Sequence, residues 1–199
     1  MSTPPSEWFA RFGPRPRDDG GGRHLEGKLL PFVELASTSA DPIDLQGAAR
    51  SGLVLYVYPR TAVPGQPLPA NWHEIPGASG CTTESCAFRD HASELRSLGA
   101  QVIGLSSQAL EEQREFAERQ HIGYPLLSDP TLALHRLLGL PVFEADGQQL
   151  YKRITLIFER QRIVKVFYPI YPPDSHPAEV AAWLRARKAP GGSSLPAFD

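Results

Sequence analysis

The sequence predicts an α/β fold with a mixed central β-sheet and helices on both of its faces. Residues 53–58 form a continuous apolar and aromatic run, which is typical of a central strand buried on both faces. A second apolar run, residues 101–105, follows after a helical segment and predicts a strand–helix–strand unit with parallel strands. Residues 155–158 and 163–167 flank a four-residue polar turn, which indicates a β-hairpin.

Two helices are expected around the second predicted strand. Phe88, Ala92 and Leu95 recur at helical spacing, and Gly99 follows them as a residue suited to end a helix. A further helix is expected after Ser107, with two acidic residues in its first turn, where the helix dipole favours negative charge.

The second half of the chain predicts two more helices. Asp129 and Pro130 are expected to start a short helix that Gly139 stops, and Pro177 opens a final helix with an apolar side. A βαβ half followed by a ββα half is the arrangement of a thioredoxin-like fold.

The chain is long enough for one domain with extensions. With 199 residues, of which 41% are hydrophobic, it can bury one sizeable core. We expect a flexible N-terminal arm over residues 1–27, because proline and glycine are dense there. The domain is expected over residues 28–188, with an inserted loop at about 60–76, and a flexible tail over residues 189–199.

Composition argues against several partners and compartments. A formal net charge of −2 gives no electrostatic case for nucleic acid or an anionic membrane. No run approaches the roughly 20 apolar residues of a membrane span, and the N-terminus lacks the apolar core of a signal peptide. We therefore expect a cytoplasmic protein, in whose reducing surroundings a disulfide is transient rather than structural.

The two cysteines of the chain, Cys81 and Cys86, lie five positions apart. This spacing is not Cys-x-x-Cys, and no second pair exists to complete a zinc site, so redox chemistry between the two sulfurs is the leading interpretation. Cys81 follows the first predicted strand at the start of a helix, where ligands bind in open α/β sheets. The positive end of the helix dipole there predicts a lowered thiol pKa and a thiolate at neutral pH.

Helix geometry keeps these two sulfurs apart. Five residues advance the helix by about 7.5 Å, and a disulfide tolerates at most roughly 7 Å between Cα atoms on suitably facing residues. The first turn or two of the helix must therefore unwind before Cys81 and Cys86 can bond.

Four short blocks of the sequence stand out together: Tyr58-Pro59, Gly80-Cys81-Thr82, Cys86-Ala87-Phe88-Arg89-Asp90 and Arg153-Ile154-Thr155. They resemble the signature of the peroxiredoxins, in particular the bacterioferritin co-migratory protein (Q-type) branch of the AhpC/TSA superfamily. The resemblance extends over about residues 26–186.

The resemblance implies a role for each matching residue. Cys81 corresponds to the peroxidatic cysteine, which attacks the peroxide, and Cys86 to the resolving cysteine of members that form a disulfide within one helix. Pro59 corresponds to the proline that shields the sulfur, and Arg153 to the arginine that holds thiolate and peroxide. Backbone N–H groups at Gly80 and Cys81 are further candidates for binding the substrate.

The chain departs from the family pattern just before Cys81. Pro59 lies 22 positions before Cys81 rather than seven, and Ala78 occupies the position of the family threonine that binds peroxide. Thr61, Ser79 or backbone groups alone are the candidates for replacing that hydroxyl.

These observations predict a thiol-dependent peroxidase for hydrogen peroxide and organic hydroperoxides. An intramolecular Cys81–Cys86 disulfide would be recycled by thioredoxin or a similar donor, with no cofactor or metal, in a monomer or alternatively a dimer. The alternatives are a general thiol-disulfide oxidoreductase and a non-enzymatic redox sensor or holdase. Two roles also stay open for Glu84, which could orient an arginine of the pocket or only favour the start of the helix.

Overall fold

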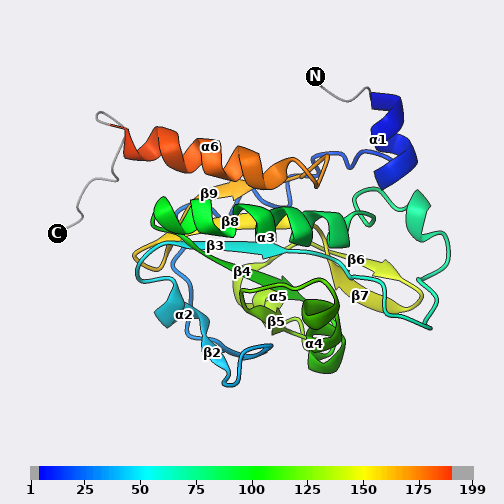
Figure 1. The fold of residues 1–199 in the computed structure, drawn as a ribbon, viewed down its shortest axis with the longest axis horizontal. Helices are drawn as coiled ribbons and strands as arrows, with labels where there is room; N and C mark the ends of the chain where they lie inside the picture. The colour runs from blue at the N-terminus through cyan, green and yellow to red at the C-terminus, as the bar shows by residue number, and fades with distance from the viewer. Residues whose placement is uncertain (1–4, 190–199) are drawn as a thin grey trace.

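The computed structural model describes residues 5–189, which form a seven-stranded mixed sheet flanked by helices and a separate two-stranded hairpin (Figure 1). The strands of the sheet lie in the order β2-β1-β5-β4-β3-β8-β9. Their bounds are β1 Glu34–Ser37, β2 Ile43–Asp44, β3 Leu53–Val57, β4 Gln101–Ser106, β5 Leu126–Ser128, β8 Ile154–Glu159 and β9 Arg162–Phe167. The hairpin consists of β6 Val142–Ala145 and β7 Gln148–Tyr151.

Helices lie on both faces of the sheet; α1 precedes the first strand, α6 follows the last, and the others lie between strands. They are α1 Pro5–Phe12, α2 Leu45–Ala48, α3 Cys81–Ser97, α4 Leu110–Arg119, α5 Ala133–Leu138 and α6 His176–Lys188, together with the 3-10 turn η1 Trp72–Glu74. Within residues 5–189, no helix combines the length and apolarity needed to cross a bilayer.

The centre of the sheet confirms the predicted fold class. β3 pairs in parallel with β4 and antiparallel with β8, and all five of its residues are buried. The predicted strand–helix–strand unit is thus β3, α3 and β4. α3 ends just before Gly99, whose φ of 76° is in the left-handed region that glycine adopts readily.

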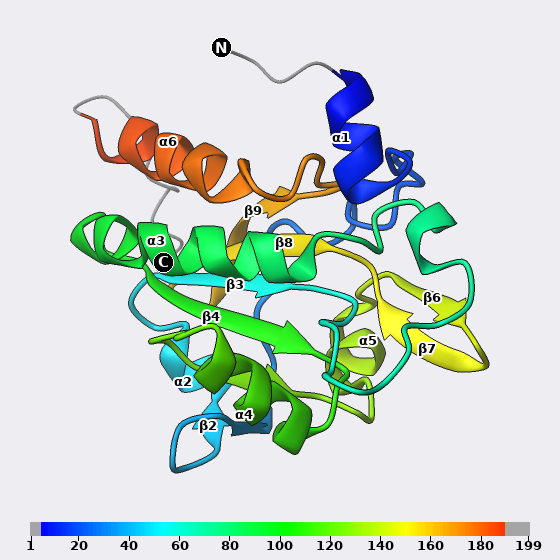
Figure 2. The ribbon, with the colours of Figure 1, turned by 45° about the vertical axis from the view of Figure 1, so that its right-hand side comes forward.

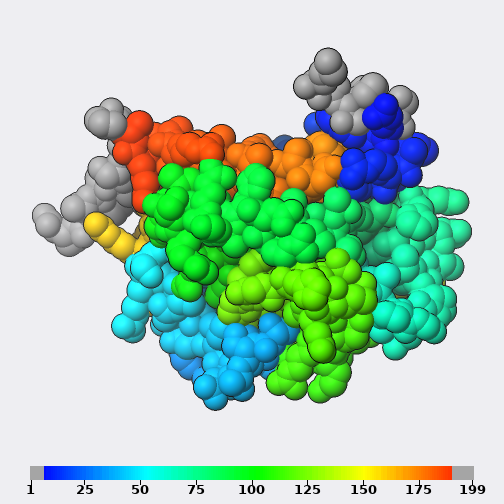
Figure 3. All heavy atoms as spheres, viewed as in Figure 1, coloured from blue at the N-terminus to red at the C-terminus, as the bar shows by residue number. Residues whose placement is uncertain are grey.

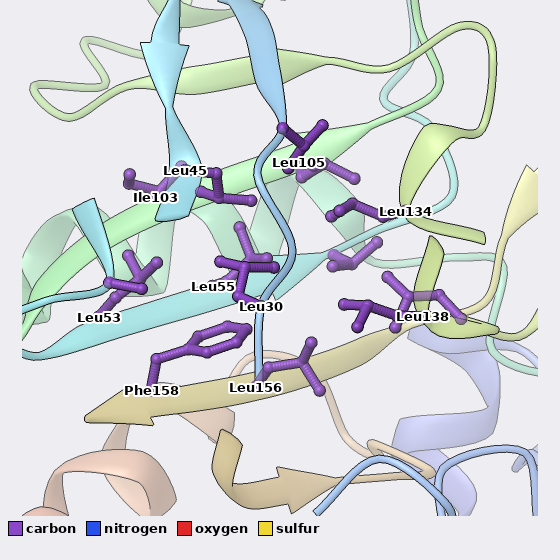
Figure 4. Close-up of a cluster of buried hydrophobic side chains, with 14 of the residues drawn as sticks. Leu30, Leu45, Leu53, Leu55, Ile103, Leu105, Leu134, Leu138, Leu156 and Phe158 are labelled. Atoms are coloured by element: carbon purple, nitrogen blue, oxygen red, sulfur yellow. The ribbon is translucent and has the colours of Figure 1, made fainter. Parts of the chain in front are cut away.

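Alternation along β3 builds two cores, one on each face of the sheet. Leu53, Leu55 and Val57 face an apolar cluster beneath α2 and α5, which Figure 4 shows as interlocking aliphatic side chains and a phenyl ring. Val54 and Tyr56 face the opposite cluster, under α3 and α6. Figure 2 shows these two helices side by side over that face.

Two predicted boundaries were wrong in detail. α5 begins at Ala133 rather than at Asp129, because the Asp129 carboxylate lies before the helix and accepts hydrogen bonds from the amides of Ala133 (2.8 Å) and Leu134 (3.0 Å). The turn between β8 and β9 contains two residues rather than four. These are Arg160 and Gln161, and both have positive φ, as a type I′ hairpin turn requires.

The expected N-terminal arm is packed against the domain over the part that the structure describes. Phe12 and Leu25 are buried, and Asp19 Oδ2 lies 2.5 Å from Lys152 Nζ. Figure 3 shows the segment in blue, resting between the orange and the cyan-green parts of the chain. Residues 5–12 of this segment form the helix α1, and turns occupy residues 21–27. Residues 1–4, and the expected tail apart from residue 189, lie outside the described residues.

Candidate active site around Cys81

Cys81 is the first residue of α3, and the backbone can turn into the helix here because the preceding residue, Gly80, is glycine. Gly80 has a φ of 99°, and a Cβ atom there would lie 2.4 Å from Pro173 Cγ and 3.0 Å from Phe12 Cδ1. Only glycine fits this turn without displacing its neighbours. The tight turn buries the Cys81 side chain, which is 3% exposed.

Three groups from separate segments surround the Cys81 sulfur. Arg153 Nη2 donates a hydrogen bond to it at 3.2 Å, and the backbone amide of Arg60 favours its thiolate form and lowers its pKa. The thiol itself donates to the carbonyl oxygen of Ala78 at 3.4 Å. Arg153 reaches the site because it immediately precedes β8, which is the antiparallel neighbour of β3. The structure therefore brings Cys81 and Arg153 together from 72 positions apart in the chain.

The guanidinium of Arg153 is fixed by a buried ion pair with Glu84 in the first turn of α3. Arg153 Nη2 also donates to the carbonyl oxygens of Gly77, Ala78 and Ser79, at 3.4, 3.4 and 3.0 Å. Of the two roles left open for Glu84, this arrangement supports the one in which it orients an arginine. Sequence reasoning could not decide this, because it depended on where Arg153 lies.

The prediction of a lowered thiol pKa at Cys81 was wrong for this conformation. Burial raises the pKa of Cys81 and outweighs the opposing effect of Arg153, while the Glu84 carboxylate raises it further. Burial likewise raises the pKa of Glu84, although Arg153 opposes the shift. Burial lowers the pKa of Arg153, but Cys81 and Glu84 more than compensate and raise it, so the guanidinium stays charged. The position of Cys81 at the start of a helix did not reveal that Arg153 contacts both Cys81 and Glu84.

Cys86 lies on the second turn of α3 and contacts a different part of the molecule. Its half-buried thiol is 3.4 Å from Gln120 Oε1, and the Gln120 carbonyl accepts a hydrogen bond from Arg89 Nη1 at 2.6 Å. Cys81 and Cys86 are both free thiols on one continuous helix. They must leave separate sets of partners before their sulfurs can bond.

The two candidate hydroxyls have other partners. The Thr61 hydroxyl donates to Gln108 Oε1 at 3.0 Å, and its backbone N–H donates to the same atom at 2.7 Å. The Ser79 hydroxyl lies 3.0 Å from Nδ1 of His73. Among residues 5–189, neither hydroxyl forms a hydrogen bond with Cys81.

The structure also positions Pro59 and the segment expected to be an inserted loop. Pro59 is buried two residues after the end of β3, and its carbonyl accepts a hydrogen bond from Ser106 Oγ at 3.0 Å. Residues 60–76 contain η1, whose Trp72 packs near Phe143 of β6, with ring centroids 6.2 Å apart. This segment is thus anchored on the β6–β7 hairpin.

A cavity of about 610 Å³ lies beside Arg153, and sequence reasoning missed it. Its wall combines the N-terminal segment with the residues that lead to Cys81 and the end of β9: Pro14, Arg15, Pro16, Arg17, Asp19, Ile75, Pro76, Gly77, Phe143, Lys152, Arg153, Tyr168, Pro169 and Ile170. The described His, Cys, Asp and Glu side chains form no group of three suited to a metal ion.

The chain is similar in sequence to a known protein family. Residues 71–167 match the model of the AhpC/TSA family. The chain is 31% identical over 135 residues to peroxiredoxin bcp1 of Schizosaccharomyces pombe, which covers 67% of this chain and 60% of that protein. It is 28% identical over 165 residues to the chloroplastic peroxiredoxin Q of Arabidopsis thaliana, which covers 81% and 67%.

A solved structure supports the same assignment. The crystal structure of peroxidoxin BcpB from Mycobacterium tuberculosis superposes with a TM-score of 0.67 at 27% identity, covering 83% of this chain and all of that one. The sequence matches, the superposed fold and the paired thiols lead to one conclusion. The chain belongs to the AhpC/TSA family and is a peroxiredoxin of the bcp and Q kind, an oxidoreductase that uses a thiol to reduce peroxide.

Proposed function

We propose that Cys81 is the peroxidatic cysteine, that Cys86 resolves its oxidised form, and that Arg153 binds both the reactive sulfur and the peroxide. The observation that carries this proposal is the buried contact of 3.2 Å between Arg153 Nη2 and Cys81 Sγ. A fixed cation beside a nucleophilic sulfur stabilises the thiolate and the negative charge that develops on the leaving oxygen.

The first step oxidises Cys81. The Cys81 thiolate attacks one peroxide oxygen, an S–O bond forms and the O–O bond breaks. The leaving alkoxide or hydroxide takes up a proton and departs as alcohol or water, so the sulfur has lost two electrons and is a sulfenic acid. Arg153 and the Arg60 N–H lie where they can stabilise the charges of this step.

A raised thiol pKa does not exclude fast attack. Fewer molecules carry a thiolate at neutral pH, but a thiolate of higher pKa is intrinsically more nucleophilic, with a Brønsted coefficient of about 0.4–0.5. The peroxidase rate should therefore increase with pH until the pKa of Cys81 is passed.

The second step joins the two cysteines. The Cys86 thiol attacks the Cys81 sulfenic acid, an S–S bond forms, and the hydroxyl leaves with a proton as water. α3 must unwind for this, as its geometry requires. An external dithiol then reduces the disulfide, and we propose a thioredoxin-like donor.

The substrates, the oligomeric state and the cellular location can be proposed from the family and the cysteine pair. As a peroxiredoxin the protein uses a peroxide and a thiol reductant. We propose hydrogen peroxide and organic hydroperoxides as substrates; the bacterioferritin comigratory protein of Xanthomonas campestris, a structural neighbour, has alkyl peroxide reduction activity. We also propose a monomer, because both reacting sulfurs belong to one chain. We propose a cytoplasmic location, because in a reducing compartment a disulfide is transient and catalytic.

Intact-mass measurement after addition of one equivalent of hydrogen peroxide tests this assignment. The wild type should lose the mass of two hydrogen atoms, Cys86→Ser should gain one oxygen atom, and Cys81→Ser should stay unchanged. An unchanged wild-type mass would exclude the peroxidase mechanism. Reduction of a disulfide substrate without peroxide would instead support a general thiol-disulfide oxidoreductase.

A further inference from the structure

Two buried tyrosines hold the segment of α3 that separates the cysteines. The Tyr124 hydroxyl donates a hydrogen bond to the backbone carbonyl of Ser85 at 2.9 Å, and the Tyr56 hydroxyl donates to Ser85 Oγ at 3.0 Å. The two phenol oxygens are themselves 2.9 Å apart. Ser85 directly precedes Cys86 and follows Cys81 by four positions, so it belongs to the turns that must unwind.

The anchoring tyrosines come from the sheet and from the loop that leads into it, not from the helix. Tyr56 belongs to β3 and is fully buried, whereas Tyr124 lies just before β5 and is 7% exposed. The Tyr56 ring also stacks on Phe88 of α3, with ring centroids 4.4 Å apart. Burial raises the pKa of both phenols well above the ordinary tyrosine value, so they remain protonated hydrogen-bond donors.

Unwinding of the first turns of α3 carries Ser85 away from these donors. Each tyrosine then loses its bond to Ser85; one hydroxyl can donate to the other, and the second donor is left without a partner. A buried donor without its partner is costly, and water reaches this part of the core poorly. The two hydroxyls therefore favour the intact helix and oppose the movement that brings Cys86 to Cys81.

We propose that Tyr56 and Tyr124 are positioning residues that set how readily α3 unwinds, and thereby how oxidised Cys81 divides between two fates. In one, the sulfenic acid condenses with the Cys86 thiol and releases water. In the other, the sulfenate attacks a second peroxide molecule, which oxidises it to a sulfinate and releases water or alcohol. The proposal rests on the function proposed above, because it concerns the step that follows the first oxidation.

The test compares Tyr124→Phe and Tyr56→Phe with the wild type in single-turnover reactions. Each variant removes one hydroxyl and keeps the ring, and Ser85 keeps its place in the helical hydrogen-bond pattern. From the usual net value of one such bond, disulfide formation after sulfenic acid formation should become roughly 2- to 12-fold faster. The sulfinate fraction at high peroxide should fall by a similar factor, while the rate constant for the first oxidation stays unchanged.

Tyr151→Phe is the matched control. Tyr151 is also fully buried, but its hydroxyl donates to Asp129 at 2.7 Å and accepts from the His135 amide at 3.2 Å, so it contacts α5 and not α3. This variant should leave the division between disulfide and sulfinate at the wild-type value. Amide exchange of residues 81–87 in the reduced protein should increase in the Tyr56 and Tyr124 variants only.

The outcomes separate this proposal from the proposed function. If the wild type forms no disulfide with peroxide, the proposed function fails. If the wild type forms the disulfide but both tyrosine variants keep its rate and its sulfinate fraction, or resolve more slowly, the positioning role is wrong. An equal acceleration in Tyr151→Phe would also overturn it, since that result would indicate general loosening of the fold.

Discussion

The two faces of the central sheet differ in what holds them together, although β3 contributes to both. On one face, Leu53 and Leu55 pack into a cluster of aliphatic side chains and one phenylalanine ring (Figure 4), and the cluster also includes the buried Tyr151. On the other face, Tyr56 lies under α3 beside the buried ion pair of Glu84 and Arg153. Both faces bury apolar area, but the second also contains the particular polar partners that hold the start of α3.

One small domain can thereby be both stable and locally mobile. Apolar packing is non-directional, so the aliphatic face supports the sheet whatever the state of α3. Polar pairs are directional and can be lost one at a time, which suits a helix whose first turns must open after Cys81 is oxidised. The apolar face should therefore carry stability and the polar face reactivity.

The largest effect on reactivity is expected from Arg153→Met. Loss of the cation leaves Glu84 buried without its partner and removes the donor at 3.2 Å from Cys81. The rate constant for peroxide should fall by about 10²- to 10³-fold, as for loss of other well-placed donors. Stopped-flow measurement of the first oxidation, on protein shown to be folded by circular dichroism, tests this.

Arg162→Met on β9 provides the control for the loss of an arginine. Its exposed guanidinium contacts the Gly27 carbonyl and not the site. The rate constant should stay within a factor of about two of the wild type. A comparable loss in both arginine variants would contradict the assignment of Arg153.

Leu55→Ala should have the opposite pattern, with a large effect on stability and none on chemistry. Leu55 is fully buried in the aliphatic cluster, so truncation should lower the free energy of unfolding by about 2–5 kcal/mol. Urea unfolding measures this change. Leu137→Ala on α5 is the control, because Leu137 is half-exposed and its truncation should lower the free energy of unfolding by under about 0.5 kcal/mol. A reduced peroxide rate constant in folded Leu55→Ala would contradict the claim that this face affects stability and not chemistry.

Features of the fold that have local signals could be predicted from the sequence. The strand, helix and strand around Cys81 were predictable because their signals are local, namely apolar runs, helical spacing and Gly99 as a helix end. Arg153 could be assigned because its block resembles the family and its place before β8 follows from the hairpin pattern.

Features that depend on distant partners were not predictable. The pKa of Cys81 depends on its burial and on the sharing of Arg153 with Glu84, which no spacing reveals. Tyr56 and Tyr124 are 68 positions apart and lie in ordinary apolar runs, so nothing marks them as neighbours of α3. The packing of residues 5–27 against the domain was not predictable, because proline and glycine suit both loose chains and tightly packed irregular segments.

Glu84→Gln should have a smaller effect that appears mainly in the pH dependence. The Glu84 carboxylate raises the pKa of Cys81, so its removal should lower that pKa. Only the thiolate reacts, and the pH midpoint of Cys81 alkylation by iodoacetamide should therefore move to a lower pH than in the wild type.

The exposed Glu111 on α4 offers the matching charge control. Glu111→Gln removes the same charge away from the site and should leave the midpoint in place. A midpoint that rises in Glu84→Gln would show that Glu84 acts mainly by holding Arg153 in position and not through its own charge.

Amide exchange before and after one equivalent of hydrogen peroxide tests the central claim most directly. Once mass analysis confirms the Cys81–Cys86 disulfide, exchange should increase strongly across residues 80–90, while β4 and β8 stay as protected as in the reduced protein. Identical exchange across residues 80–90 in the reduced and disulfide forms would contradict the claim that α3 must unwind to join its two cysteines.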